Sequence, residues 1–522
     1  MQNEKEKEKS IQFSLCATHS EQELQNAIQK KSPKSARFSK ITRKSLDARD
    51  KGNIRYNYTV AYSKHPFTDT EEIERLPKEK LPQHPVVVVG SGPAGLFCAL
   101  RLIERGILPI VIERGAPVDE REKAIQTFAE QRILNENTNV QFGEGGAGTF
   151  SDGKLNTQTH SPLHSKVLKT FVDFGAPEEI LCLNKPHIGS DNLKKVVKNM
   201  REHILNAGGK VYFHTRLENV KTSRGGVQEL LLRNVKTNQT TSLTAQAVVL
   251  AIGHSARDTF SWLYTQGVKM TAKDFAVGVR IEHLQKDISQ AQYGDSYFKL
   301  PPADYKLVSH ASERAVFSFC MCPGGYVMPS ASEFGGVVTN GMSNYKRDGE
   351  NANSALIVQV RKTDFESEHA LAGVQFQREI EKRAFQEGGG DYRAPAQRVG
   401  DFLNGVASSG FGKVTPTYGC AVTPSDMRAV LPDFLVQPLK SAIVDMDKRL
   451  RGFACADAVL TGAETRTSSP IRMERDSQTL QSVTHENLYP CGEGAGYAGG
   501  ISSSAADGLR VADAIYQRFI QN

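Results

Sequence analysis

The chain has 522 residues, 39% of them hydrophobic, and a formal net charge of +7. Because one hydrophobic core rarely serves so long a chain, two or three domains are expected. No apolar run approaches the roughly 18 residues of a membrane span, no signal-peptide core follows the start, and the eight cysteines lack the spacing of a disulfide framework. The sequence therefore predicts a soluble cytoplasmic protein with reduced thiols and no membrane span.

The first 65 residues predict a small α/β domain, followed at 66–84 by a linker rich in proline and charge. Basic residues gather between positions 30 and 55, where they could face an anionic partner or form an ordinary solvated surface. The expected elements are strands at 11–17, 38–45 and 55–63 and a helix at 21–31.

A dinucleotide-binding βαβ unit is predicted at 86–115, with an apolar strand, a glycine turn, a helix and a second strand. Gly90 permits the tight turn, Gly92 lets the backbone approach a pyrophosphate, and Gly95 lets the helix pack closely on the strand. FAD and NAD are both compatible with such a unit.

The ends of the predicted helix and of the second strand supply the expected polar contacts. The helix begins near Pro93 and Ala94, and its N-terminus would attract the phosphates. Glu113, followed by Arg114, would accept hydrogen bonds from ribose hydroxyls, and an acid there disfavours a ribose 2′-phosphate.

Beyond this unit the chain predicts the rest of a nucleotide domain (85–269), an inserted mixed α+β domain (270–480) and a return to the first domain (481–522). No second strand-GxGxxG-helix occurs between 115 and 480, so the insert is interpreted as a substrate domain rather than a dedicated NAD(P) domain. The expected helices are at 191–206, 368–387 and 425–450, and the expected strands are at 211–213, 217–220, 228–234, 241–244, 247–252, 275–281, 315–321 and 336–339.

The βαβ unit and the C-terminal segment NLYPCGEGAGYAGGISSSAADGLRVADAI together resemble the FAD-binding domain of the glutathione reductase superfamily. More narrowly, the motifs NVQFGEGGAGTFSDGKLNT, LAIGHSARDTF, FCMCPGGYVMPS, ETRTSSPIRMERD and KSLDAR resemble the bacterial family of uncharacterised FAD-dependent dehydrogenases. This resemblance covers nearly the whole chain. It implies a Rossmann-like FAD-binding fold and a redox reaction, and it carries no established substrate.

The pattern and the resemblance together give a set of expected cofactor contacts. A loop rich in glycine at 143–153 is expected near the flavin ring, because such a loop is costly to order unless a ligand needs close backbone approach. The helix after Gly500 would direct its positive end at the flavin. The expected contacts are Gly90, Gly92, Pro93, Ala94, Gly95, Glu113, Arg114, Gly146, Gly148, Thr149, Gly153, Lys154, Leu217, Gly253, Gly492, Glu493, Gly500 and Ile501.

Three side chains are the expected catalytic candidates. His254 follows a cofactor strand, where it could face the active site or order the crossover between domains, as could Arg257 and Asp258. Arg466, like Arg472, could clamp an anionic substrate through its guanidinium or make a structural ion pair.

The third candidate is Cys322, which with Cys320 would face one side of a strand as a flavin-adjacent thiol or as a small buried residue. No matching second Cys or His pair gives zinc-ligand spacing, so no metal site is expected.

The sequence thus predicts an FAD-dependent oxidoreductase that transfers a hydride between flavin N5 and a small-molecule substrate, for which an anionic compound is a candidate. A nicotinamide or a protein is a candidate electron partner. Two alternatives stay open: an FAD-dependent RNA-modifying enzyme, motivated by the basic N-terminal domain, and a non-catalytic binding protein that retains the fold.

Overall fold

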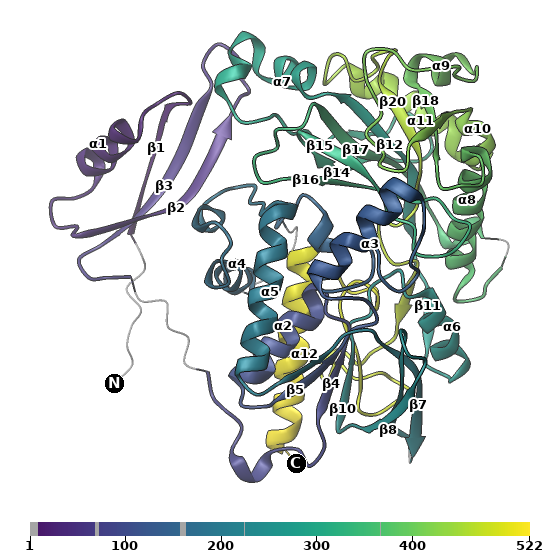
Figure 1. Cartoon of the computed structure of the whole chain (residues 1–522). Helices are drawn as coiled ribbons and strands as arrows, with labels where there is room; N and C mark the ends of the chain where they lie inside the picture. Colours follow the sequence, from purple (N-terminus) through teal and green to yellow (C-terminus); the bar gives the residue numbers. More distant parts are fainter. Residues whose placement is uncertain (1–8, 68–72, 157–162, 224, 366, 522) are drawn as a thin grey trace.

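The structure is a computed structural model of the whole chain and describes every residue except 1–8, 68–72, 157–162, 224, 366 and 522. Three groups of elements lie together in Figure 1: an N-terminal unit at the upper left, a nucleotide-binding unit below, and a cap unit at the upper right. Among the described residues, we find no helix that is both long and apolar enough to cross a membrane. The predicted linker at 66–84 falls partly outside the described residues.

The N-terminal unit is an antiparallel sheet in the order β1-β3-β2 with one helix packed on it. Its small core includes Phe13, Tyr58 and Val60, and Ser20 and Glu23 cap the helix reciprocally. The helix spans the predicted residues. The elements are β1 (Lys9–Cys16), α1 (Glu21–Lys31), β2 (Phe38–Asp47) and β3 (Arg55–Ser63).

Strand β2 connects this unit to the rest of the molecule. The Lys44 main-chain N–H donates to the Cys182 carbonyl at 2.7 Å, and the Asn184 N–H donates to the Lys44 carbonyl at 2.9 Å. Ile54 of the same unit packs into the core of the cap unit. The N-terminal unit therefore contacts both other units.

The nucleotide-binding unit is a parallel sheet in the order β22-β10-β4-β5-β6, so the last strand of the chain lies at the edge of the sheet beside β10. All four valines of β4 are buried, as a parallel strand covered on both faces requires. Helices cover one face and the predicted meander, β7-β8-β9, lies over the other. The elements are β4 (Val86–Val89), α2 (Pro93–Glu104), β5 (Pro109–Ile112), α3 (Val118–Gln131), α4 (Leu163–Asp173), α5 (Ser190–Asn206), β6 (Lys210–Tyr212), β7 (Thr215–Ser223), β8 (Gly226–Asn234), β9 (Thr240–Thr244), β10 (Ala247–Leu250), α6 (Arg257–Thr265), β22 (Leu488–Pro490) and α12 (Ile501–Gln521).

Helices α2 and α12, from opposite ends of the sequence, lie side by side in Figure 1 and pack through small residues. A Cβ atom added at Gly508 would lie 2.1 Å from the carbonyl oxygen of Ala94. Where α2 begins after the glycine turn, a Cβ at Gly95 would lie 1.9 Å from the Gly90 carbonyl oxygen. The close helix-strand packing predicted for Gly95 is confirmed.

The cap unit is built on a mixed sheet in the order β13-β14-β17-β12-β20-β18-β19, with helices packed on it. A ribbon of β11 and β21 adjoins it where the chain leaves and re-enters the nucleotide-binding unit. The elements are β11 (Met270–Ala272), β12 (Phe275–Leu284), α7 (Gln285–Tyr293), β13 (Val308–Ser309), β14 (Val316–Cys322), β15 (Gly325–Pro329), β16 (Thr339–Ser343), β17 (Asn351–Val360), α8 (Ala372–Gly388), β18 (Ala394–Arg398), α9 (Val399–Asn404), β19 (Val422–Pro424), α10 (Met427–Val430), α11 (Asp433–Asp447), β20 (Val459–Glu464) and β21 (Ile471–Met473).

Two predicted elements of the cap are wrong. The single helix expected at 425–450 is split into α10 and α11, because Pro432 lacks an N–H and forces Leu431 into an extended conformation. The strand expected at 336–339 begins only at Thr339, because Gly335 has a φ of +73° and forms a turn.

We predict that Gly508→Ala destabilises the nucleotide-binding unit by about 1–3 kcal/mol, because the new Cβ would overlap main-chain atoms of α2 that cannot move freely. Differential scanning fluorimetry should show an apparent Tm lower by several degrees. Gly410→Ala is the matched control, since a Cβ there would have no heavy atom within 4 Å. Equal Tm values for the two variants would contradict the proposed constraint.

Candidate functional site: a cavity between the sheet and the cap

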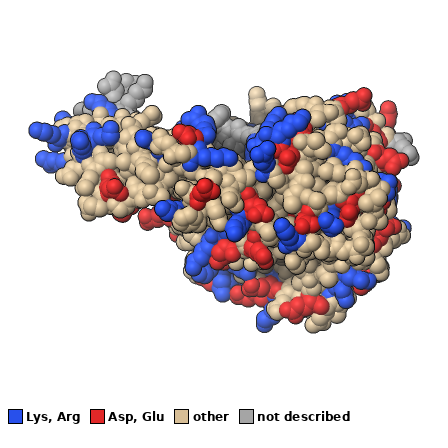
Figure 2. Space-filling view, turned by 90° about the horizontal axis from the view of Figure 1, so that it is seen from above, with Lys and Arg blue, Asp and Glu red and all other residues tan. Residues whose placement is uncertain are grey.

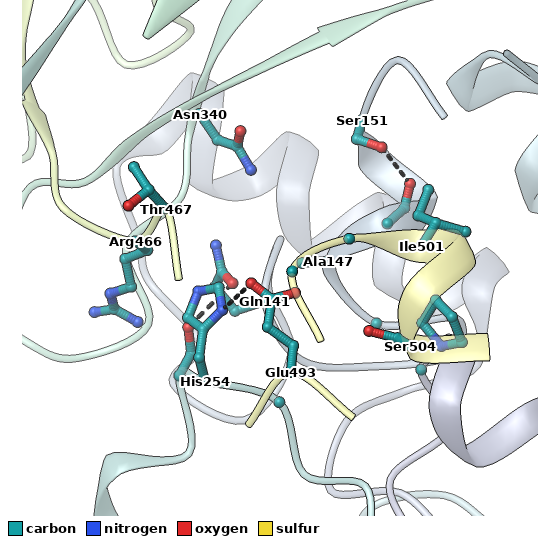
Figure 3. Close-up of a pocket in the computed structure, with 18 of the residues that line it drawn as sticks. Gln141, Ala147, Ser151, His254, Asn340, Arg466, Thr467, Glu493, Ile501 and Ser504 are labelled. Carbon is teal, nitrogen blue, oxygen red and sulfur yellow. Dashed lines mark hydrogen bonds and ion pairs between the residues drawn. The ribbon is translucent and has the colours of Figure 1, made fainter. Parts of the chain in front are cut away.

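A cavity of about 780 Å³ lies between the carboxyl ends of the parallel strands and the cap unit. Its floor comes from the nucleotide-binding unit and its roof from cap strands β14, β16 and β17 and the segment after β20. Figure 3 shows Asn340, Arg466 and Thr467 on the cap side, facing Glu493, Ala147 and Ile501 on the floor. Ligands of open α/β sheets bind in this position.

Two glycine loops form the middle of the floor. Gly90 has a φ of +101°, and a Cβ there would lie 2.3 Å from the Ala251 carbonyl oxygen, so the tight turn requires glycine. A Cβ at Gly146 would lie 3.0 Å from the Cα of Gly92, so the two loops pass with their backbones almost in contact. A ligand above them meets main-chain atoms rather than side chains.

Glu113 connects several of these loops. Its carboxylate accepts hydrogen bonds from the Ser91 N–H at 2.9 Å, the Ser91 hydroxyl at 2.8 Å, the Gly115 N–H at 2.9 Å and the Gly143 N–H at 3.1 Å. These four bonds use about as many acceptor positions as a carboxylate offers. The structure therefore gives Glu113 a role in shaping the floor, while its contact with ribose stays a prediction.

Two helix N-termini point at the cavity. Gly92, Pro93 and Ala94 at the start of α2 line it, as do Gly500 and Ile501 at the start of the 21-residue α12. Unpaired N–H groups and the positive end of the helix dipole make both sites favourable for anions.

A buried ion pair fixes the loop before α12. Asp507 accepts from both terminal nitrogens of Arg475, at 2.9 and 2.7 Å, and from the Gly492 N–H at 2.8 Å. Arg475 also donates to the Pro490 carbonyl and stacks on Tyr497, with its guanidinium carbon 3.8 Å from the ring centroid.

Most of the expected cofactor residues line the cavity. Gly95, Thr149 and Gly492 do not: Gly95 packs α2 on β4, the Thr149 hydroxyl donates to the Glu144 carbonyl, and Gly492 lies against Ala94. These three support the floor from behind. The expected residues that line the cavity are Gly90, Gly92, Pro93, Ala94, Glu113, Arg114, Gly146, Gly148, Gly153, Lys154, Leu217, Gly253, Glu493, Gly500 and Ile501.

His254 faces the cavity, whereas its neighbours order the crossover. The His254 Nδ1 lies 2.9 Å from the Glu493 carboxylate, and both residues line the cavity (Figure 3). Arg257 is instead fully buried, and Asp258 accepts two hydrogen bonds of 2.9 Å from Arg114.

A buried charge network forms part of the roof. Arg257 donates to Glu381 at 2.8 and 2.7 Å, and Arg466 donates to the same carboxylate at 3.1 and 3.0 Å. Burial alone would raise the pKa of Glu381, but the charges and hydrogen bonds of the two arginines outweigh burial and hold it well below its usual range.

This network changes the interpretation of Arg466. The residue lines the cavity, yet its Nε and Nη2 are bonded to Glu381 and its Nη1 donates to Ser332 at 2.6 Å. Arg466 therefore makes the structural ion pair that the sequence left open. Arg472 lies outside the cavity lining, with its guanidinium 5.3 Å from the centroid of the Tyr497 ring.

The structure corrects the prediction for Cys322. A bulge in β14 between Phe319 and Cys322, with a φ of +43° at Cys320, breaks the alternation that would place both thiols on one face. Cys320 lines the cavity, whereas Cys322 is completely buried beside it.

Sequence reasoning missed the polar and aromatic residues that the cap contributes. These positions show no motif. Strand register rather than local pattern turns those on β14, β16, β17 and β20 toward the cavity, and the others lie on connecting segments. The sequence predicted that residues 270–480 form a separate domain, but it did not predict which residues of that domain face the cavity. The missed cap residues include Asp304, Lys306, Phe317, Phe319, Asn340, Ile357, Glu464 and Thr467, and Lys185 of the nucleotide-binding unit was missed as well.

The cavity fits FAD in three respects. The facing glycines leave main-chain atoms exposed to a pyrophosphate, two helix N-termini can receive anionic groups, and the cavity runs from Leu217 on the meander to the cap. The fold and this site define a flavoprotein of the glutathione reductase type.

Comparisons with known proteins agree with that class. Residues 85–124 match the family model of an FAD binding domain, residues 274–467 match a model described as FAD-dependent protein, C-terminal domain-like, and residues 5–63 match a domain of unknown function. An uncharacterised protein of Clostridium beijerinckii is 45% identical over 521 residues, covering 95% of this chain and 96% of that protein. The chain belongs to the same family of FAD-dependent proteins as this relative, and its cofactor is FAD.

Solved structures with a similar arrangement are more distant. The flavin-dependent brominase Bmp2 is 12% identical, with a TM-score of 0.39 over 84% of this chain and 80% of that one. A glycerol-3-phosphate dehydrogenase from Bacillus halodurans complexed with FAD is 13% identical, with a TM-score of 0.34 over 84% of this chain and 65% of that one.

We predict that Glu113→Ala weakens FAD binding at least tenfold, because four hydrogen-bond donors that shape the floor lose their acceptor, and each hydrogen bond to a charged group is worth about 1.5–3 kcal/mol. Quenching of flavin fluorescence on titration with apoprotein measures the change. The exposed Glu79→Ala is the control and should bind FAD like the wild type. An unchanged affinity for FAD in Glu113→Ala would show that this carboxylate does not shape the floor of the cavity.

We also predict that Glu381→Gln lowers stability by about 3–5 kcal/mol at pH 7, since it removes the carboxylate that two buried arginines share and leaves them only Glu333, at 2.8 Å from Arg257 and 4.0 Å from Arg466. The folded-state pKa is depressed, so the stabilisation is complete above the unfolded pKa of about 4.3 and is lost as the pH falls below it. Urea unfolding should show that the difference in unfolding free energy between wild type and variant is smaller at pH 3.5 than at pH 7. Glu379→Gln, exposed on the same helix, should show no gap at either pH.

Proposed function

We propose that this protein is a dehydrogenase-type oxidoreductase in which a small substrate lies between the cap and FAD and exchanges a hydride at flavin N5. The observation that carries the proposal is a single cavity whose floor is built for a dinucleotide and whose roof comes from a separate sheet. When bound, FAD supplies two-electron chemistry in such a site.

The chain's own residues would orient the substrate and exclude water. Phe317, Phe319 and Ile357 supply an apolar roof, and the side chains of Asn340 and Thr467 can hydrogen-bond a polar group beside it (Figure 3). The N-terminus of α12 would stabilise negative charge that develops on the reduced flavin. His254, paired with Glu493, is the candidate for holding or moving a proton at its ring nitrogen.

Lysines at the cap end of the cavity favour an anionic substrate. Lys154, Lys185 and Lys306 all line it. Asp304 partly offsets this charge, because it accepts from Lys185 at 2.8 and 2.9 Å. The remaining positive charge would attract a carboxylate or a phosphate, and these lysines take over the role that sequence reasoning gave to Arg466.

An absorption spectrum of the purified protein, followed by anaerobic addition of NADH, NADPH and a panel of small carboxylates and phosphates, tests the proposal. Bleaching of the flavin band by one compound would identify the electron donor. A purified protein that is colourless and does not take up added FAD would instead support the non-catalytic alternative.

We predict that Lys306→Gln lowers kcat/KM for an anionic donor found in that panel about threefold to tenfold, and that the difference shrinks in 0.5 M salt because added ions screen the lysine. Lys299→Gln, an exposed residue outside the cavity, is the control. A loss of activity that does not depend on salt would argue against an electrostatic role.

A second candidate, an enzyme acting on RNA, is favoured by the charge of the N-terminal unit. Residues 1–65 contain fourteen Lys and Arg against seven Asp and Glu, whereas the rest of the chain has equal numbers of each. Figure 2 shows Lys and Arg side chains gathered on the projecting unit at the left. RNA that co-purifies at low salt and dissociates at high salt would support this candidate, and RNA-free protein at low salt would exclude it.

A further inference from the structure

Two cysteines of the cap meet at the edge of the flavin cavity, on the bulge of β14. Cys320 lines the cavity and is partly exposed, whereas Cys322 is completely buried. The Cys322 thiol donates to the main-chain carbonyl of Cys320 at 3.3 Å, so its sulfur lies against the backbone of the other cysteine. One thiol is thus open to the cavity, and the other is held directly behind it.

The bulge matters for whether these two sulfurs can be joined. On a regular strand, residues i and i+2 have Cα atoms ~6.6 Å apart, near the upper limit of the 4.4–6.8 Å found in disulfides. Here the pairing with β17 slips between Phe319 and Cys322, and Cys320 takes a φ of +43°. A bulge bends a strand locally, which relieves the extended spacing that disfavours a disulfide between such neighbours.

Cys320 lies near two positive side chains, Arg280 and Lys154, which are themselves paired with Glu464 and Asp152. Buried Arg280 directs its Nη1 at the Cys320 carbonyl at 3.4 Å, and Lys154 lines the same cavity. A hydrogen bond from the Cys322 side chain and the charges of Lys154 and Arg280 outweigh burial and lower the pKa of Cys320. The pKa of Cys322 is raised by its hydrogen bond to the Cys320 side chain and by burial. The more acidic thiol of the pair is thus the one that lines the cavity, and a thiol that ionises readily favours thiol oxidation.

Cys491 shows that a cysteine in the cavity lining does not acquire a lowered pKa by its position alone. Cys491 also lines the cavity, but burial and the neighbouring Asp507 raise its pKa well above the ordinary range. Its thiol stays protonated and has no partner cysteine two residues away. Among the residues that the structure describes, only the pair of Cys320 and Cys322 combines a thiol in the cavity lining, a second cysteine two residues away and nearby positive side chains.

We propose that Cys320 and Cys322 form a dithiol/disulfide couple that exchanges two electrons with the bound FAD. In the oxidising direction, the Cys320 thiolate and the Cys322 thiol form one S–S bond and the S–H bond of Cys322 breaks. FAD takes up the two electrons and that proton, giving FADH⁻, so atoms and charge balance. The reverse reaction reduces the disulfide. This couple requires FAD but not the hydride transfer proposed above.

Differential alkylation followed by mass spectrometry tests the couple without an activity assay. The holoprotein is reduced with dithiothreitol, desalted anaerobically, reoxidised with four equivalents of the one-electron oxidant ferricyanide per FAD, and then alkylated. A parallel sample lacks FAD. We expect the peptide that contains Cys320 and Cys322 to lose both alkylation sites and two hydrogen masses in the holoprotein, and to keep both sites in the FAD-free chain.

Anaerobic titration with dithionite gives a second readout. The aerobically purified holoprotein should accept four electrons per FAD, whereas Cys320→Ser and Cys322→Ser should accept two. Cys455→Ser, which replaces an exposed cysteine, should still accept four. Two-electron uptake by the wild type, together with full alkylation of both cysteines after reoxidation, would overturn the proposal. The alkylation experiment needs no variant, so a variant that fails to fold does not prevent the test.

Discussion

The close approach of helices α2 and α12 is the constraint on which the rest of the structure depends. A side chain at Gly508 of α12 would overlap the backbone of α2 at Ala94 and approach that of Cys98. Because this position carries no side chain, residues separated by about four hundred positions along the chain form one layer on the sheet. Both helix N-termini then open into the same cavity, and the anion-binding ability of each is added to that of the other.

The cap depends on a different interaction, the sharing of Glu381 between Arg257 and Arg466. Arg257 follows a strand of the nucleotide-binding unit, Glu381 lies on α8 of the cap, and Arg466 lies on the segment that leads back to the floor. Buried charges are costly unless they are paired, so the three side chains favour one relative placement of roof and floor. That placement defines the space above the glycine loops, and with it the shape offered to a substrate.

Much of the nucleotide-binding half could be predicted because local backbone geometry and composition specify it. The glycine turn at Gly90, the buried valines of β4 and the meander are required by short-range rules, and the structure has them where expected. The roof could not be predicted in the same way. Whether Asn340 or Phe319 faces the cavity depends on strand register between segments far apart in sequence, and a bulge of one residue changes the answer.

The sequence by itself determined that the chain binds a dinucleotide, because glycines at fixed spacing and a helix after a buried strand have few other uses. The resemblance of its two ends to a known FAD-binding domain then indicated FAD. Only the tertiary structure decided that Cys320 rather than Cys322 lines the cavity, that Arg466 is occupied by Glu381, and that Glu113 holds the floor loops together. The physical reason is that hydrogen bonds and burial involve partners distant in sequence, which no local pattern specifies.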